Sequence, residues 1–150
     1  MYTCRVLRLV LVLLAGLVLL GAHPGVAEHE VYYRYVVLGY AQDGHGAPLP
    51  ARPVELVRDR TGLAYRDETD ARGFFLVIAR LGDESAGESL TLRIGDRQVR
   101  IAARFDPSNH VDDRGTQMDL VGERFVERAA SFRATLARFL QNPGAERERP

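Results

Sequence analysis

Short hydrophobic segments that alternate with turn-forming residues are the feature that most constrains the fold of this 150-residue chain. Such runs, separated by Gly, Pro, Asp and Asn about every 8–12 residues, are typical of an antiparallel two-sheet sandwich. Strands do not alternate with long helical segments here, so a parallel sheet is not expected. The seven predicted strands cover residues 32–40, 54–57, 63–69, 74–79, 89–94, 99–105 and 117–121.

Two turns carry the clearest local signals. Asp70-Ala71-Arg72-Gly73 places an acid that can bond its own backbone, and then a glycine, directly before the next apolar run. Gly95-Asp96 separates two segments with strict alternation of apolar and polar residues, which predicts a hairpin with one wet face. The continuous apolar run 74–79 predicts a central strand that is buried on both faces.

The hydrophobic period changes after Gly122, where apolar residues recur at spacings of three and four. This stripe predicts an amphipathic α-helix over residues 122–142 that Asn142-Pro143-Gly144 ends, with a disordered tail over 143–150. The stripe either packs against the sandwich or meets a partner protein. The predicted partner-binding residues are Phe125, Phe132, Leu136 and Phe139.

Residues 1–27 have the pattern of a secretory signal peptide. Two arginines precede the apolar run 9–22, which as a helix would cover about 21 Å, less than the roughly 30 Å hydrocarbon core of a membrane. Gly25-Val26-Ala27 then offers the small residues that a signal peptidase reads. We therefore expect cleavage after Ala27 and a periplasmic or secreted domain; the alternative is an uncleaved membrane anchor at residues 6–22.

Composition narrows the function of the remaining 123 residues (150 − 27), which form one domain over residues 28–121 plus the helix. They carry 18 arginines, no lysine and 20 acids, hence a formal charge of −2 (18 − 20). This balance gives no reason to expect nucleic acid as a partner. The sole cysteine, Cys4, lies in the signal segment, so neither a disulfide nor a thiolate metal ligand is expected in the domain.

Three histidines and four tyrosines offer alternative binding functions. Imidazole suits copper and zinc, so His29, His45 and His110 are candidate metal ligands, although none of them form a closely spaced pair. Solvated loop histidines are the other interpretation, and no cofactor is otherwise expected. Exposed aromatic rings could stack on sugars. The tyrosines considered for such a carbohydrate platform are Tyr32, Tyr33, Tyr35 and Tyr40.

A family resemblance rests on about forty residues. It is carried by Val37-Leu38-Gly39-Tyr40, Asp43-Gly44, Gly46-Ala47-Pro48-Leu49-Pro50, Pro53-Val54-Glu55-Leu56 and Thr69-Asp70-Ala71-Arg72-Gly73-Phe74-Phe75. This stretch resembles the carboxypeptidase regulatory-like domains, small seven-stranded sandwiches of the transthyretin or prealbumin type. The resemblance implies a mainly β, antiparallel prealbumin/Ig-like sandwich, here followed by one C-terminal amphipathic helix.

Members of that family are typically non-catalytic domains that support folding or bind partners. Related hydroxyisourate hydrolases end in Tyr-Arg-Gly-Ser, whereas this sequence ends Arg147-Glu148-Arg149-Pro150. Intradiol dioxygenases use a closely spaced histidine pair, which this sequence lacks. The expected function is therefore that of an exported accessory domain, not an enzyme, that engages an unidentified cell-envelope protein. Contact with a membrane is expected only if the N-terminal segment stays uncleaved.

Overall fold

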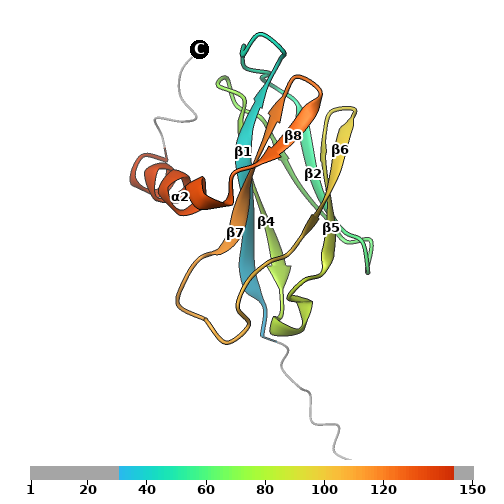
Figure 1. Cartoon of the computed structure of the whole chain (residues 1–150), viewed down its shortest axis with the longest axis vertical. Coiled ribbons are helices and arrows are strands. Elements are labelled where there is room, and N and C mark those ends of the chain that lie inside the picture. The colour runs from blue at the N-terminus through green and yellow to red at the C-terminus, as the bar shows by residue number, and fades with distance from the viewer. Residues whose placement is uncertain (1–30, 144–150) are drawn as a thin grey trace, which may run out of the picture. The chain divides into compact units, whose positions relative to one another are not determined.

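The computed structural model describes residues 31–143, which form two four-stranded β-sheets and one C-terminal α-helix (Figure 1). The first sheet has the order β4 (Phe74–Leu81), β1 (Tyr33–Gln42), β7 (Arg114–Val121), β8 (Arg124–Glu127). The second has the order β3 (Ala64–Glu68), β2 (Pro53–Arg58), β5 (Ser89–Ile94), β6 (Arg97–Ala102). Two 3-10 turns, η1 (Asp83–Ser85) and η2 (Ala129–Ser131), precede β5 and the helix α2 (Phe132–Gln141). The predicted signal peptide or anchor, His29 and tail residues 144–150 lie outside the described residues.

The prediction of a mainly β fold with a C-terminal helix is confirmed, and each of the seven predicted segments overlaps one observed strand. Seven strands and a helix over 122–142 are nevertheless wrong, because Arg124–Glu127 forms an eighth strand. Gly122, with φ of 63°, and Glu123 make a two-residue hairpin that pairs Val121 with Arg124. Phe125 then faces the space between the sheets opposite Leu120, so a residue assigned to the helical stripe belongs to a strand.

The first sheet is not fully antiparallel, which corrects a second expectation. β1 pairs with β4 in antiparallel orientation but with β7 in parallel orientation, starting at Tyr35 and Arg114. Parallel neighbours must be joined by a long connection, and here β4 and all four strands of the second sheet lie between them in the sequence. A pairing between such distant segments leaves no local sequence pattern.

The β1–β7 pairing is interrupted in the middle, where a side-chain carboxylate, instead of a backbone carbonyl, accepts the hydrogen bond from a backbone N–H. The register runs from the pair Leu38–Gln117 to the pair Ala41–Leu120. Between these pairs, the Tyr40 N–H donates to Asp119 Oδ1 at 3.0 Å. The strands approach so closely here that a Cβ at position 39 would overlap the carbonyl oxygen of Met118, which requires glycine.

Strand β1 is buried on both faces because it lies between two apolar clusters. Its residues Tyr35 and Val37 face the core between the sheets, and burial raises the pKa of Tyr35 to about 12. Val36 and Leu38 point to the outer face, where α2 packs over them (Figure 1). The prediction that β4 is buried on both faces holds only in part, because Ile78 is 40% exposed.

The outer face of the second sheet is polar and open. Glu55 on β2 accepts hydrogen bonds from Arg66 on β3 and Arg93 on β5. These bonds, that from Arg93 first, hold the pKa of Glu55 below its usual range. No helix packs on this face, and within residues 31–143 no helix is both long and apolar enough to cross a membrane.

Candidate functional site

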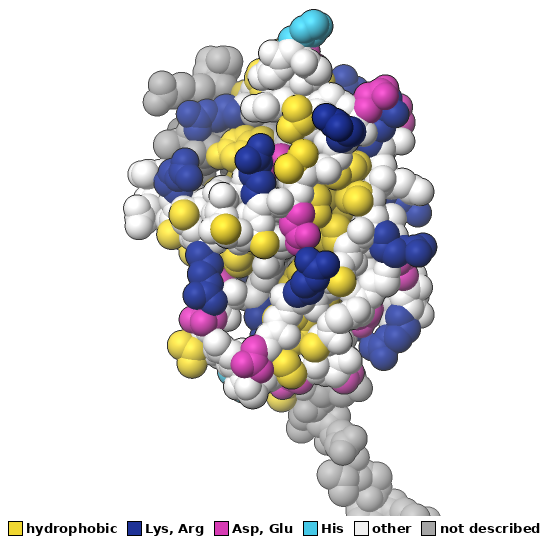
Figure 2. Space-filling view, in the orientation of Figure 1, with side chains coloured by type: hydrophobic (Ala, Val, Ile, Leu, Met, Phe, Trp, Pro, Cys, Tyr) yellow, Lys and Arg dark blue, Asp and Glu magenta, His cyan; other side chains and the backbone are white. Residues whose placement is uncertain are grey.

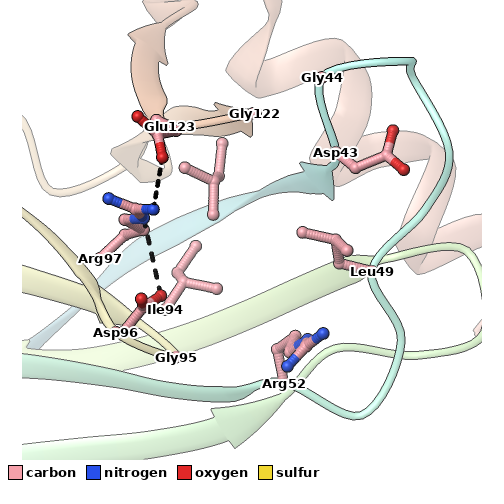
Figure 3. Close-up of a pocket in the computed structure, with 11 residues that line it drawn as sticks. Asp43, Gly44, Leu49, Arg52, Ile94, Gly95, Asp96, Arg97, Gly122 and Glu123 are labelled. Atoms are coloured by element: carbon pink, nitrogen blue, oxygen red, sulfur yellow. Dashed lines mark hydrogen bonds and ion pairs between the residues drawn. The ribbon is translucent and has the colours of Figure 1, made fainter.

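The turns that follow β1, β5 and β7 meet at one end of the sandwich, which we call the apical end. They surround an open pocket of about 470 Å³ (Figure 3). Its apolar lining comes from Leu49, Ile94 and Leu120. Figure 3 shows Arg97 and Glu123 on one side of the pocket, and Arg52 on the other.

The long β1–β2 loop that forms one wall is stiffened by a single carboxylate. Asp43 Oδ1 accepts the backbone N–H groups of His45 at 2.8 Å and Ala47 at 2.9 Å. These bonds, that from Ala47 first, hold the pKa of Asp43 below its usual range. Thr69 Oγ1 anchors the end of the loop, because it donates to the Leu49 carbonyl and accepts the Arg52 N–H. The wall is therefore ordered before any ligand arrives.

The charges around the pocket are only partly neutralised. Arg97 lies 2.7 Å from Glu123 and 3.6 Å from Asp96. The exposed guanidinium of Arg52, by contrast, forms no ion pair with any residue from 31 to 143. The pocket thus combines an apolar lining, the ion pairs of Arg97, and two charges without an ion-pair partner among the described residues, the guanidinium of Arg52 and the carboxylate of Asp43. The guanidinium can bind an acidic group.

The structure separates the two described candidate metal ligands. His45 follows the end of β1, whereas His110 stacks on Tyr33 at its beginning. Ten extended residues span about 30 Å, so one ion cannot contact both side chains. A single site that uses His29, His45 and His110 is therefore excluded. Within residues 31–143, no three His, Cys, Asp or Glu side chains are grouped so as to hold a metal ion.

His110 instead belongs to a cluster at the opposite, basal end of the sandwich. Its ring lies parallel to Tyr33 at 4.7 Å, and its Nε2 lies 2.9 Å from Asp83 Oδ2. Buried Arg114 donates to Asp83 Oδ1 at 2.8 Å and lies between the rings of Tyr33 and Phe105. Burial works against ionisation of Asp83, but the Arg114 and His110 hydrogen bonds outweigh it and lower its pKa.

This basal cluster serves to fix loops. Arg114 Nη2 also donates to the carbonyls of Pro107 and Asn109, which ties the β6–β7 loop to η1 through Asp83. Nη1 of Arg114 is buried without a hydrogen-bond partner among the described residues. Contacts with the two ring faces offset part of the cost of desolvating this cation.

Most of the predicted partner-binding stripe packs against the domain itself. Phe132 and Leu136 are only 3% and 5% exposed and pack on Val36, Leu38 and Phe74. Phe139 is half-buried against the same cluster, and Phe125 packs against the core between the sheets. Phe132 and Leu136 are therefore not available to a partner without opening the fold, whereas Phe125 and Phe139 stay partly exposed, and Phe139 lines a pocket beside the turn that follows β3.

The four tyrosines do not form a platform either. Tyr35 is buried between the sheets, and Tyr33 lies under His110. Tyr40 packs on Phe74, while the exposed Tyr32 lies near the other end of β1. The four rings therefore do not share one flat exposed surface on which a sugar could stack.

Sequence reasoning missed the residues that surround the apical pocket and those of the basal cluster. Arg52, Arg97 and Glu123 sit in or beside turns, where charged residues are common and carry no motif. The turn glycines Gly95 and Gly122 were the available signal, because they mark hairpins whose tips meet at one end of the sandwich. Arg114 had no such signal, since a single buried arginine leaves no pattern in the sequence.

Comparisons with known proteins show no family. No family model matches the chain, and no curated protein matches it. Among solved structures, a similar one is the dioxygenase domain of a dioxygenase carbohydrate-binding protein fusion from the cellulolytic bacterium Streptomyces sp. SirexAA-E. It shares 16% identity at a TM-score of 0.45, over 64% of this chain and 83% of that one. A likeness this weak carries no argument about the activity of this chain.

Proposed function

We propose that this chain is an exported, non-catalytic accessory domain that binds another cell-envelope protein through its apical pocket. The observation that carries the proposal is the pocket itself, in which an apolar lining lies beside the unpaired guanidinium of Arg52. A protruding segment of a partner, with an apolar side chain next to a carboxylate, would match both features.

Two further observations support a binding role over the alternatives. Most of the helical stripe packs within the domain, which favours another surface for a partner, and the pocket is open to solvent with a hydrogen-bonded wall. The exposed imidazole of His110 is oriented by Asp83, but no Ser or Thr hydroxyl among the described residues bonds to it. The basal cluster therefore lacks the nucleophile that a Ser–His–Asp mechanism needs.

The proposed fold relationship and location rest on the sequence. The two-sheet sandwich agrees with the resemblance to the carboxypeptidase regulatory-like domains of prealbumin type. Export rests on residues 1–27. Determination of the N-terminus of the chain isolated from its native cell envelope tests export directly: a chain that begins at Glu28 supports cleavage, whereas one that begins at Met1 supports the anchored alternative.

Site-specific crosslinking in cells tests the pocket. A photo-crosslinking phenylalanine analogue replaces Asp96 at the rim of the pocket, or Arg66 on the outer face of the second sheet as a matched control. We expect an adduct with one envelope protein from position 96 and not from position 66, and we expect Arg52→Glu to abolish it. Equal adducts from both positions, or none from position 96, would refute the proposal.

A further inference from the structure

Two arginines face each other on the first sheet without an acid between them. Arg34 of β1 is the direct cross-strand partner of Arg80 of β4, in the same register that pairs Val36 with Ile78. Val36 points to the outer face that α2 partly covers, so by strand alternation both arginines leave the sheet on that face. Both side chains are exposed, and neither forms an ion pair within the part of the chain that the structure describes.

Such a pair is costly in the absence of an anion, since like charges directly opposite each other destabilise a sheet. Elsewhere the described arginines are mostly neutralised, and Figure 2 shows basic and acidic side chains interspersed over one face of the molecule. On the second sheet, Arg66 and Arg93 project from β3 and β5 on either side of β2, but Glu55 of β2 lies between them and binds both. A carboxylate is the group that the Arg34–Arg80 pair lacks.

An exposed apolar side chain lies beside this pair. Ile78, two residues before Arg80 on β4, is 40% exposed on the same outer face. β4 is an edge strand of the first sheet, and side chains of β3 bind its backbone at Leu76 and Arg80, so the patch is open from above the face. An extended segment that carries a carboxylate next to an apolar residue would cover Ile78 and neutralise both arginines.

We propose that Arg34, Ile78 and Arg80 form a docking patch for an extended acidic segment of a partner protein. The patch lies on the outer face of the first sheet and is distinct from the apical pocket. The neighbouring acids favour a narrow peptide over an anionic membrane. Asp83 and Glu84 follow β4 after Gly82 and are partly neutralised by Arg114 and Arg60, yet a flat layer of lipid phosphates would meet these carboxylates as well.

Fluorescence anisotropy with a defined probe tests the patch. The probe is a fluorescein-labelled Glu-Val-Glu-Val-Glu peptide, with the Gln-for-Glu peptide as its uncharged counterpart, titrated with the whole purified chain at low salt. Arg80→Glu is the test variant, and Arg124→Glu is the matched control. Arg124 is also exposed on the first sheet and also lacks an ion pair among the described residues. Arg52→Glu in the apical pocket separates this proposal from the proposed function.

We expect Arg80→Glu to weaken binding of the acidic peptide at least about tenfold, while Arg124→Glu and Arg52→Glu keep it. The Tm of Arg80→Glu should stay equal or rise, because an opposite-charge pair replaces a like-charge pair, so the loss cannot be ascribed to unfolding. Equal loss in Arg124→Glu, binding of the Gln peptide, or a wild-type Kd above about 1 mM would each overturn the proposal. Vesicles of phosphatidylglycerol that retain the chain only when Arg80 is present, with the peptide unbound, would assign the patch to lipid and also overturn it.

Discussion

The outer face of the first sheet is apolar and covered by a helix, whereas the outer face of the second sheet is polar and exposed to water. On the first sheet, α2 covers an apolar surface, and Phe132 and Leu136 are almost completely buried there. On the second sheet, exposed ion pairs such as Glu55–Arg66 remain in contact with water. The first face contributes stability through burial of apolar area, whereas exposed ion pairs contribute little and are screened by salt. The helix thus creates a second hydrophobic core on the outer face of the first sheet. The outer face of the second sheet stays polar and exposed, as in a sandwich of two layers.

The largest expected effect comes from removal of the central contact of the covered face. Phe132→Ala should lower the free energy of unfolding by about 3–5 kcal/mol, because it opens a cavity between α2 and β1. Urea unfolding followed by circular dichroism measures the change. Arg66→Ala on the open face is the control and should stay within about 0.5 kcal/mol of the wild type. A loss below about 1 kcal/mol for Phe132→Ala would mean that the helix does not pack as described.

Two aspartates, one on each side, allow the covered and the open face to be compared with the same substitution. Asp119 on the covered side accepts hydrogen bonds from Tyr40 N–H and Gln117 Nε2 and pairs with Arg128, and its side chain is 11% exposed. Asp119→Ala should cost about 1–3 kcal/mol, because buried donors lose their acceptor. Asp59 on the open side accepts the hydroxyls of Ser89 and Thr91 close to water. Asp59→Ala should cost clearly less in the same urea titration; an equal cost would contradict the difference between the faces.

Acid should weaken the second sheet more than the covered face. Glu88 is paired with Arg58 at 2.7 Å, with both side chains largely buried, and the Arg58 hydrogen bonds lower the pKa of Glu88. A lowered pKa in the folded state means that this stabilisation is complete above the ordinary value of 4.5 and is lost as the pH falls through the folded-state value. The free energy of unfolding should therefore decline below about pH 5.

The control for this acid effect is Glu88→Gln. The variant should be less stable than the wild type at neutral pH, because it leaves Arg58 buried without a counter-charge. Its further loss between about pH 5 and pH 3 should be smaller than that of the wild type. Urea titrations at several pH values measure both quantities, and parallel pH profiles for the two proteins would assign the acid sensitivity to other groups.

The smallest effect is expected at the centre of the open face. Glu55→Gln removes the negative charge that Arg66 and Arg93 share and leaves one amide oxygen as an acceptor; all three side chains are accessible to water. We expect no change in Tm at moderate salt and at most a slight one at low salt, because the pairs are screened. Thermal unfolding at two salt concentrations checks this. A clear loss of stability that persists at high salt would show that the open face contributes more than its exposure indicates.

The contrast between the faces also explains which parts of the fold could be predicted from the sequence. β5 and β6 have one wet face, so their residues alternate strictly and the hairpin at Gly95 could be recognised. β8 could not be recognised in the same way. The position of Phe125 fits a helical stripe that continues to Phe132, and it fits equally well a strand that ends at Glu127. Only the pairing with β7 decides between these two patterns, and that contact is not encoded by local periodicity.

The proposed binding sites were less predictable than the fold. The aromatic stripe at residues 125–139 gave the strongest apparent binding signal, but the outer face of the first sheet needs those side chains for its own burial. Arg52, Arg34 and Arg80 gave no signal, because an arginine becomes informative only when its neighbours in space are known to lack an acid. That information comes from register and turn geometry, not from spacing along the chain.

The parallel pairing of β1 with β7 has a consequence for the order in which the domain can fold. It joins residues as far apart as Tyr40 and Asp119, 79 positions along the chain. Closure of so long a loop is entropically costly, and folding that depends on such distant contacts is slow. In a polypeptide that emerges from its N-terminus, β1 would be available early, but its sheet could be completed only after β7, β8 and α2 had emerged. The topology thus delays the final packing of the first sheet until nearly all of the chain is available.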